Sequence, residues 1–180
     1  MKYIALLRGI NISGKNKISM NELKLELSRH AYQNVATYLN SGNIIFESNL
    51  DQESIMHNIH DIIKNKYDLE IPVFVINELE LEDVLEHDPN WWGNDNKEIY
   101  DNLIFIIPPA TYNEVYTAIG EPKEDIEKIK EYKNCIFWSY SLKDYRKSNW
   151  WKKTASTYIK DQITIRTART MKKVLEICKK

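Results

Sequence analysis

The residues best suited to chemistry follow the first apolar run of the sequence. Residues 3–7 are apolar and predict a buried strand, and residues 8–16 then supply one arginine, two glycines, two asparagines and one lysine. A loop of this composition can direct backbone N–H groups and cationic side chains at one point, which suits an anion. The candidate anion-binding residues of this loop are Arg8, Asn11, Lys15 and Asn16.

Gly9, Gly14 and Lys15 have nearly the spacing of a phosphate-binding P-loop. That motif requires Ser or Thr directly after the lysine to hold magnesium, whereas Asn16 stands there. The next helix is expected to begin near Ser19 rather than at the lysine. The loop is therefore predicted either to bind an anion in another way, or to be a turn whose glycines take positive φ and whose asparagines bond to the backbone.

A second group of candidates lies in a basic C-terminal segment. Residues 143–180 hold 12 Lys and Arg against 3 Asp and Glu, whereas residues 1–142 hold 13 against 23. This asymmetry indicates a polyanionic partner, an anionic substrate, or packing against the acidic part of the chain. Further anion-binding candidates are Asn43, in an earlier Ser-Gly-Asn turn, and the basic residues Arg146, Lys147, Arg166 and Arg169.

Residues 145–153 interleave aromatic and cationic side chains. In nucleic-acid binding, rings stack on bases while cations meet phosphates. The alternative is an amphipathic helix over residues 149–159, in which Trp151 shares a core-facing stripe with Tyr158 and Ile159. That alternative places Trp151 in the core and explains Trp150 less well.

The remaining reactive side chains favour structural roles. His57 and His60 lie opposite the apolar face of their predicted helix, so they are expected in solvent rather than on a metal. Cys135 and Cys178 have no partner at ligand spacing, which is typical of packed, reduced thiols. No nucleophile motif and no clear general base are present. We expect no metal and no cofactor, and the pattern favours binding over acid–base catalysis.

The order of predicted elements indicates an α+β fold. Strands at residues 2–8, 35–39, 44–47 and 73–76 alternate with helices from Ser19 and from about residue 51 to 67. This β-α-β-β-α-β order is that of a ferredoxin-like sandwich. The second half is predicted to repeat it, from a strand at 103–107, a helix after Thr111, a hairpin over 125–140, a helix at 149–159 and a strand at 163–166. A last helix has Met171, Val174, Leu175 and Cys178 in a helical stripe.

Several stretches resemble the bacterial family known as domain of unknown function 1697. They are residues 3–11, 14–16 and 41–46, Met20 with Leu23, the basic-serine segment 146–148 and the threonine-arginine segment 164–170. Thr167 and Ser13 depart from the asparagine and glycine that are common in the family. The resemblance implies a cytosolic α+β protein with ferredoxin-like halves, and it implies no established activity.

Together these observations predict two ferredoxin-like halves packed together with an extra C-terminal helix, divided as residues 1–77 and 78–180 or forming one compact unit. The chain has no secretory signal and no apolar stretch of membrane-spanning length, so a cytoplasmic protein without a membrane partner is expected. The first functional hypothesis is an anion-binding module for nucleic acid or a nucleotide. The alternatives are an enzyme acting on a small phosphorylated or carboxylated metabolite, and a protein in which the motif residues are structural. Nothing in the sequence sets an oligomeric state.

Overall fold

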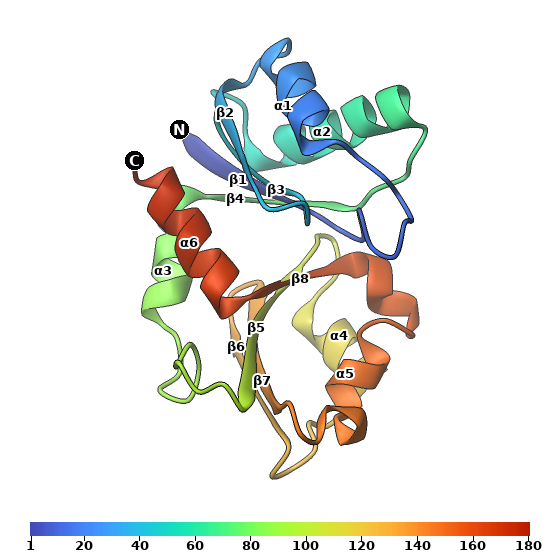
Figure 1. Ribbon diagram of the computed structural model, residues 1–180, viewed down its shortest axis with the longest axis vertical. Coiled ribbons are helices and arrows are strands. Elements are labelled where there is room, and N and C mark those ends of the chain that lie inside the picture. The colour runs from blue at the N-terminus through green and yellow to red at the C-terminus, as the bar shows by residue number, and fades with distance from the viewer. The chain divides into compact units, whose positions relative to one another are not determined.

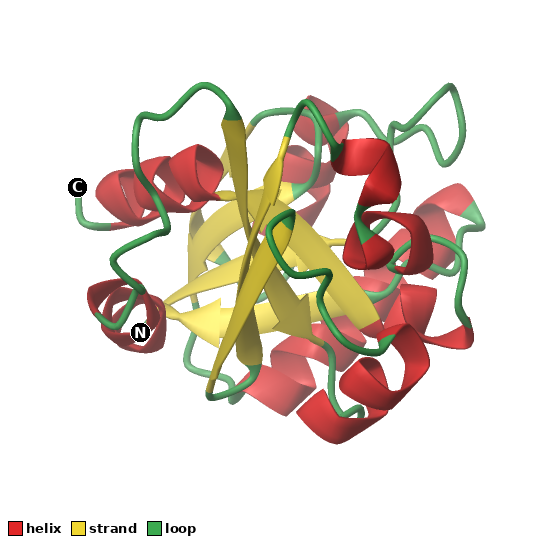
Figure 2. Cartoon of the chain, turned by 90° about the horizontal axis from the view of Figure 1, so that it is seen from below, coloured by secondary structure: helices red, strands yellow, loops and turns green.

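The computed structural model describes all 180 residues and contains two four-stranded antiparallel sheets (Figures 1 and 2). The chain forms two compact units. The first unit comprises Met1–Glu82 with Lys173–Lys180, and the second unit comprises Asp83–Lys172. Two boundaries between the units fall inside helices, α3 (Glu78–Glu86) and α6 (Ala168–Cys178).

The first unit has the strand order β2-β3-β1-β4, and every neighbouring pair in it is antiparallel. Its elements in chain order are β1 (Lys2–Leu7), α1 (Met20–Ser28), β2 (Gln33–Tyr38), β3 (Asn43–Glu47), α2 (Gln52–Tyr67) and β4 (Val73–Asn77). The crossover through α1 joins β1 to β2, and β3 lies between them. This is the split β-α-β topology that the sequence predicts.

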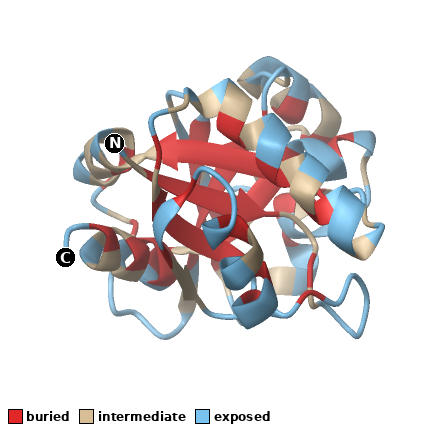
Figure 3. Ribbon diagram, turned by 90° about the horizontal axis from the view of Figure 1, so that it is seen from above, coloured by how far each residue is buried: buried red, intermediate tan, exposed pale blue.

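Both helices of the first unit cover one face of its sheet (Figure 1). Helix α1 buries Met20, Leu23 and Leu27, and α2 buries three isoleucines. These side chains form one core with alternate residues of the strands, among them Ala5 and Phe46. Figure 3 shows the same pattern, since the strands are mostly buried and the outer faces of the helices are exposed. The apolar period of 3.6 in the helices therefore places their residues as expected, and the continuous apolar runs of β1, β3 and β4 are buried along most of their length.

The second unit repeats this topology with the strand order β6-β7-β5-β8. Its elements are β5 (Ile99–Ile106), α4 (Tyr112–Ile119), β6 (Glu127–Tyr132), β7 (Cys135–Ser141), the 3₁₀ helix η1 (Tyr145–Lys147), α5 (Asn149–Lys153), the 3₁₀ helix η2 (Tyr158–Gln162) and β8 (Ile163–Thr167). The fold class predicted from the sequence is confirmed: an α+β fold with two ferredoxin-like halves and a C-terminal helix. The helix predicted after Thr111 is α4, and it begins with a capping box between Thr111 and Glu114.

The two faces of the second sheet carry different side chains. One face packs on the segment that contains α4 and α5, through Ile104, Ile136 and Trp138 in a core with Val115 and Trp150. The opposite face carries the alternate residues of the same strands. On that face the first residues of β5 and the last residues of β7 include polar side chains, and these residues line the pocket described below.

The helix predicted over residues 149–159 is wrong beyond Lys153, where α5 ends. Hydroxyl groups in the next turn bond back to the backbone: Ser156 Oγ donates to the carbonyl of Lys152 and Thr157 Oγ1 to that of Lys153, both at 2.8 Å. Such bonds compete with the helical hydrogen bonds.

The amphipathic pattern predicts that Trp151 is buried, but the structure buries its neighbour Trp150 instead. Trp150 is fully buried and donates from Nε1 to the carbonyl of Gly120 at 3.0 Å, whereas Trp151 is 41% exposed. The predicted stripe needed a continuous helix to residue 159. Because the helix stops after five residues, that stripe does not form.

Strand β5 begins at Ile99, four residues before the predicted start. The apolar run begins only at Leu103, because Asp101 and Asn102 are polar. Both residues are nevertheless buried and belong to the strand. None of the helices combines the length and the apolar composition that a membrane span requires. The structure also has no group of three His, Cys, Asp or Glu side chains placed to hold a metal ion.

Candidate functional site

The loop after β1 is a tight hairpin. The N–H of Lys15 donates to the carbonyl of Ile12 at 2.9 Å, and the two residues between them, Ser13 and Gly14, have φ of 50° and 78°. Two successive residues with positive φ define a type I′ turn, which strongly favours Asn and Gly. The glycine- and asparagine-rich composition of this loop therefore has a conformational cause.

The asparagine amides of this loop bond to the backbone. Asn11 Nδ2 donates to the carbonyls of Ile18 and Asn40, at 2.9 and 2.8 Å, and its Oδ1 accepts from the N–H of Ile18. Asn16 Nδ2 donates to the carbonyl of Gly9 at 3.0 Å. Lys15 is exposed and Arg8 is half-buried. The anion-binding role of Arg8, Asn11, Lys15 and Asn16 stays a prediction, and the amide bonds give both asparagines a structural role.

The Ser41–Asn43 turn lies beside this loop. The bond from Asn11 to Asn40 joins them, and the N–H of Leu7 donates to the carbonyl of Gly42 at 2.9 Å. Asn43 is fully buried, and its Nδ2 donates to the carbonyl of Tyr38 at 2.8 Å. The proximity follows from the antiparallel pairing of β1 with β3, which brings the end of one strand to the start of the other.

The basic candidates of the second unit occupy separate elements. Arg146 and Lys147 are exposed on η1, where Arg146 Nε donates to the Tyr145 hydroxyl at 3.0 Å and Lys147 pairs with Asp144 at 2.8 Å. The Lys147 ammonium lowers the pKa of Asp144. Arg166 on β8 is 7% exposed and donates from Nη1 to Thr164 Oγ1 and to the carbonyl of Ile165. Arg169 is exposed on α6.

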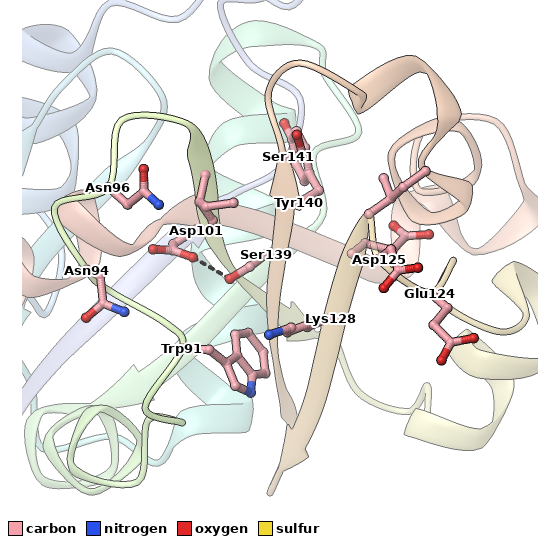
Figure 4. Close-up of a pocket in the computed structure, with 13 residues that line it drawn as sticks. Trp91, Asn94, Asn96, Asp101, Glu124, Asp125, Lys128, Ser139, Tyr140 and Ser141 are labelled. Carbon is pink, nitrogen blue, oxygen red and sulfur yellow. Dashed lines mark hydrogen bonds between the residues drawn. The ribbon is translucent and has the colours of Figure 1, made fainter.

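A pocket of about 590 Å³ opens in the second unit, beside the start of β5, the end of β7 and residues 124–128 (Figure 4). Its volume is typical of small-molecule sites. Four segments line it: the loop before β5, the first residues of β5, residues 124–128 around the start of β6, and the end of β7. The lining residues are Trp91, Asn94, Asn96, Ile99, Asp101, Glu124, Asp125, Ile126, Glu127, Lys128, Ser139, Tyr140 and Ser141.

The floor of the pocket contains a polar row across three strands. Ser139 of β7 pairs with Asp101 of β5 on one side and with Lys128 of β6 on the other, so the three side chains project from one face. Ser139 Oγ donates to the Asp101 carboxylate, as the dashed line in Figure 4 shows. Asp101 is 8% exposed and Ser139 is 4% exposed. We call Asp101, Ser139 and Lys128 the polar row.

The loop before β5 forms a fixed wall of the pocket. Trp92 is buried, donates from Nε1 to the carbonyl of Asn102 at 2.7 Å and packs edge-on against Phe137. The next N–H, of Gly93, donates to Asp101 Oδ2 at 2.9 Å. Lys172 Nζ donates to the carbonyl of Gly93 at 3.0 Å. These bonds hold the half-buried Trp91 at the pocket.

Two other groups that line the pocket are committed to the fold. The Glu127 carboxylate is buried and accepts from the Trp138 indole, the Ser148 hydroxyl and three backbone N–H groups, two of which belong to the first turn of α5. Burial and the neighbouring Tyr100 raise the pKa of Tyr140 to about 12. Its phenol is therefore neutral at physiological pH, and Asp101 and Lys128 remain as the charged groups of the floor.

The sequence analysis did not select the polar row. The available signal was the alternation of polar side chains with buried ones at the ends of β5 and β7, where Asp101, Ser139 and Ser141 interrupt apolar strands. The three residues of the row come from three different strands, and only the register of the sheet places them together. Of the two neighbouring tryptophans in the loop before β5, Trp92 is buried and Trp91 lines the pocket.

The fold and the pocket define an α+β protein with two ferredoxin-like units and a polar pocket on one sheet. The chain belongs to the family described as "Protein of unknown function (DUF1697)", whose pattern matches residues 1–137. It is also similar to the solved "conserved bacterial protein SP0830 from Streptococcus pneumoniae", at 28% identity and a TM-score of 0.87 over 98% of each chain. No curated protein matches the chain. The resemblance stated from the sequence is thus confirmed.

Proposed function

We propose that this protein binds a small organic molecule in the pocket of its second unit. The observation that carries the proposal is the polar row in a pocket of about 590 Å³. Burying a carboxylate costs free energy unless it is well bonded. Asp101 receives bonds from Ser139 and Gly93, and a carboxylate accepts about four. The remaining acceptor capacity faces a site of ligand size.

A thermal-shift screen of a metabolite library tests this proposal. A ligand at 100 times its Kd adds about 2.7 kcal/mol to the stability of the folded state. Lys128→Ala should reduce the shift, because its side chain contributes a donor to the floor. Lys130→Ala is the matched control, since Lys130 is exposed on the same strand and outside the pocket lining. If every ligand that binds shifts the melting temperature of both variants equally, the binding site is not this pocket.

A second candidate function is the anion binding expected from the sequence, for a nucleic acid or a nucleotide. Trp151 supports this function because its ring is exposed. The ring also contacts Tyr145 edge-on, with a distance of 4.8 Å between the ring centroids. The Arg146 guanidinium lies 5.6 Å from the Tyr145 ring centroid, and Lys152 is exposed on α5. Exposed rings beside cations suit stacked bases and phosphates.

Titration with a single-stranded oligonucleotide at two salt concentrations tests this second function. Affinity should fall as salt rises, through counterion release. Lys152→Ala should weaken binding, whereas Lys160→Ala, an exposed lysine on η2, is the control. Weak binding with no salt dependence would remove nucleic acid as a partner. Phosphorylated or carboxylated metabolites in the library screen test the enzyme alternative, beginning with whether such a substrate binds.

A further inference from the structure

The atoms that line the pocket identify the class of ligand that it suits. In the polar row, Ser139 Oγ donates its one hydrogen bond to Asp101, so toward a ligand the Ser139 oxygen can act only as an acceptor. Asp101 is also an acceptor, and Lys128 is a donor. Acceptors and a donor thus succeed one another across three strands at about 4.8 Å spacing. A hydroxyl group both donates and accepts, so a ring with several hydroxyl groups satisfies such a row.

The wall adds one flat surface and two amides. Asn94 Nδ2 donates to the carbonyl of Asn90, and Asn96 Oδ1 accepts from the N–H of Glu98. The Asn94 carbonyl and the Asn96 amino group are left to contact a ligand. Trp91 offers an indole surface, against which the C–H face of a saturated ring or the face of a base can pack. A hydroxylated ring combines the apolar face and the polar edge that these groups require.

The charges at the pocket select against an anion. Glu124 and Asp125 are exposed in the lining, and Asp101 lies in the floor. Lys128 is the one cation of the lining, and the Glu127 carboxylate, whose donors are all neutral, adds a further negative charge. A phosphate group would meet an excess of negative charge. In the floor itself the Asp101 and Lys128 charges balance each other, so the groups that would contact a ligand there suit a neutral one.

We propose that the ligand of this pocket is a neutral ring carrying several hydroxyl groups. This inference rests on the proposed function of the same pocket. The ring can come from a free monosaccharide or from the ribose of a nucleoside, since both present the same hydroxyl chemistry.

Matched pairs of probes test the inference by calorimetry on the full chain. Glucose, galactose and ribose represent free sugars, and adenosine and uridine represent nucleosides, each measured beside its monophosphate. At least one neutral probe should bind about tenfold more tightly than its phosphate, a difference of 1.4 kcal/mol. The double variant Glu124→Gln with Asp125→Asn should close this gap, and Glu131→Gln, an exposed change outside the pocket, should leave it. Raised salt should narrow the gap in the unaltered protein.

The outcomes separate the inference from the proposed function. Tighter binding of a phosphate, or of organic amines from the library, with sensitivity to Lys128→Ala overturns the inference and keeps the pocket as the binding site. Binding of none of the probes overturns the inference, and an empty library screen overturns the proposed function as well. Binding of free sugars without nucleosides, or the reverse, identifies the source of the ring.

Discussion

Glu127 is a buried carboxylate at the start of β6, and its contacts explain its presence in an otherwise apolar core. It is 5% exposed and accepts from Asn149 N at 2.8 Å and from Ser148 Oγ at 2.5 Å, so its charge lies at the first turn of α5. Negative charge is stabilising at a helix N-terminus. The carboxylate thereby bonds the start of β6 to a helix that begins 22 residues later in the chain.

Glu127→Gln should therefore destabilise the protein by about 2–3 kcal/mol, because the amide replaces one acceptor with a donor that faces other donors. Urea unfolding measures the loss. Glu131→Gln makes the same chemical change at an exposed position of β6 and should fall within about 0.5 kcal/mol of the unaltered protein. Equal effects of the two changes would show that the hydrogen bonds of Glu127 contribute no net stability.

Cys178 gives the first unit a pH-dependent stability. Burial, together with the nearby Glu78 carboxylate, raises the pKa of this thiol from 9.0 to about 11. Between these values the unfolded chain loses the proton before the folded chain does, so stability falls as pH rises from about 9 to 11. The difference in unfolding free energy between the protein and its Cys178→Ala variant should therefore be constant from pH 6 to 8.5 and shrink by pH 11. A constant difference up to pH 11 would contradict the raised pKa.

At the scale of elements, the pattern of neighbouring residues in the sequence is enough to predict the topology but not enough to predict the pocket. The 3.6 period of α2 and the capping box of α4 are properties of adjacent residues, and both elements were predicted within two residues. Helix α5 ends at Lys153, where the next hydroxyl groups bond to backbone carbonyls instead of to water. The spacing of residues in the sequence does not determine which of these bonds forms. The polar row depends on sheet register between β5, β6 and β7, and register arises from pairing between distant strands.

Two glycines, one in the loop after β1 and one in the turn between β2 and β3, separate the free-energy cost of backbone strain from the cost of steric overlap. Gly9 and Gly42 both have positive φ, at 67° and 80°. A Cβ on Gly9 would meet nothing within 4 Å, whereas one on Gly42 would lie 2.6 Å from Leu7 Cβ. Gly9→Ala should cost about 1–2 kcal/mol, the cost of the left-handed conformation. Gly42→Ala should cost at least about 2 kcal/mol more, from overpacking. Urea unfolding of the two variants measures both costs, and equal values would rule out the steric term.

At the scale of the whole molecule, the chain passes between its two units inside helices. Residues 78–82 of α3 belong to the first unit and residues 83–86 to the second, and α6 is divided after Lys172. Backbone hydrogen bonds in a helix join residues four apart, so each of these helices is bonded across its boundary. The division into domains at residues 77 and 78 stays a prediction, because compactness does not show that either part folds alone.

These continuous helices lead us to expect one cooperative unfolding transition. All five tryptophans lie in the second unit, so tryptophan fluorescence reports on that unit, whereas far-UV circular dichroism reports on both. Gly42→Ala damages only the first unit, yet it should lower the urea midpoint seen by fluorescence as much as the midpoint seen by circular dichroism. Coincident transitions from two probes are the test of two-state behaviour. A fluorescence midpoint that stays unchanged while the dichroism curve divides into two steps would show that the units unfold independently, and the proposed pocket would then remain intact after the first unit has unfolded.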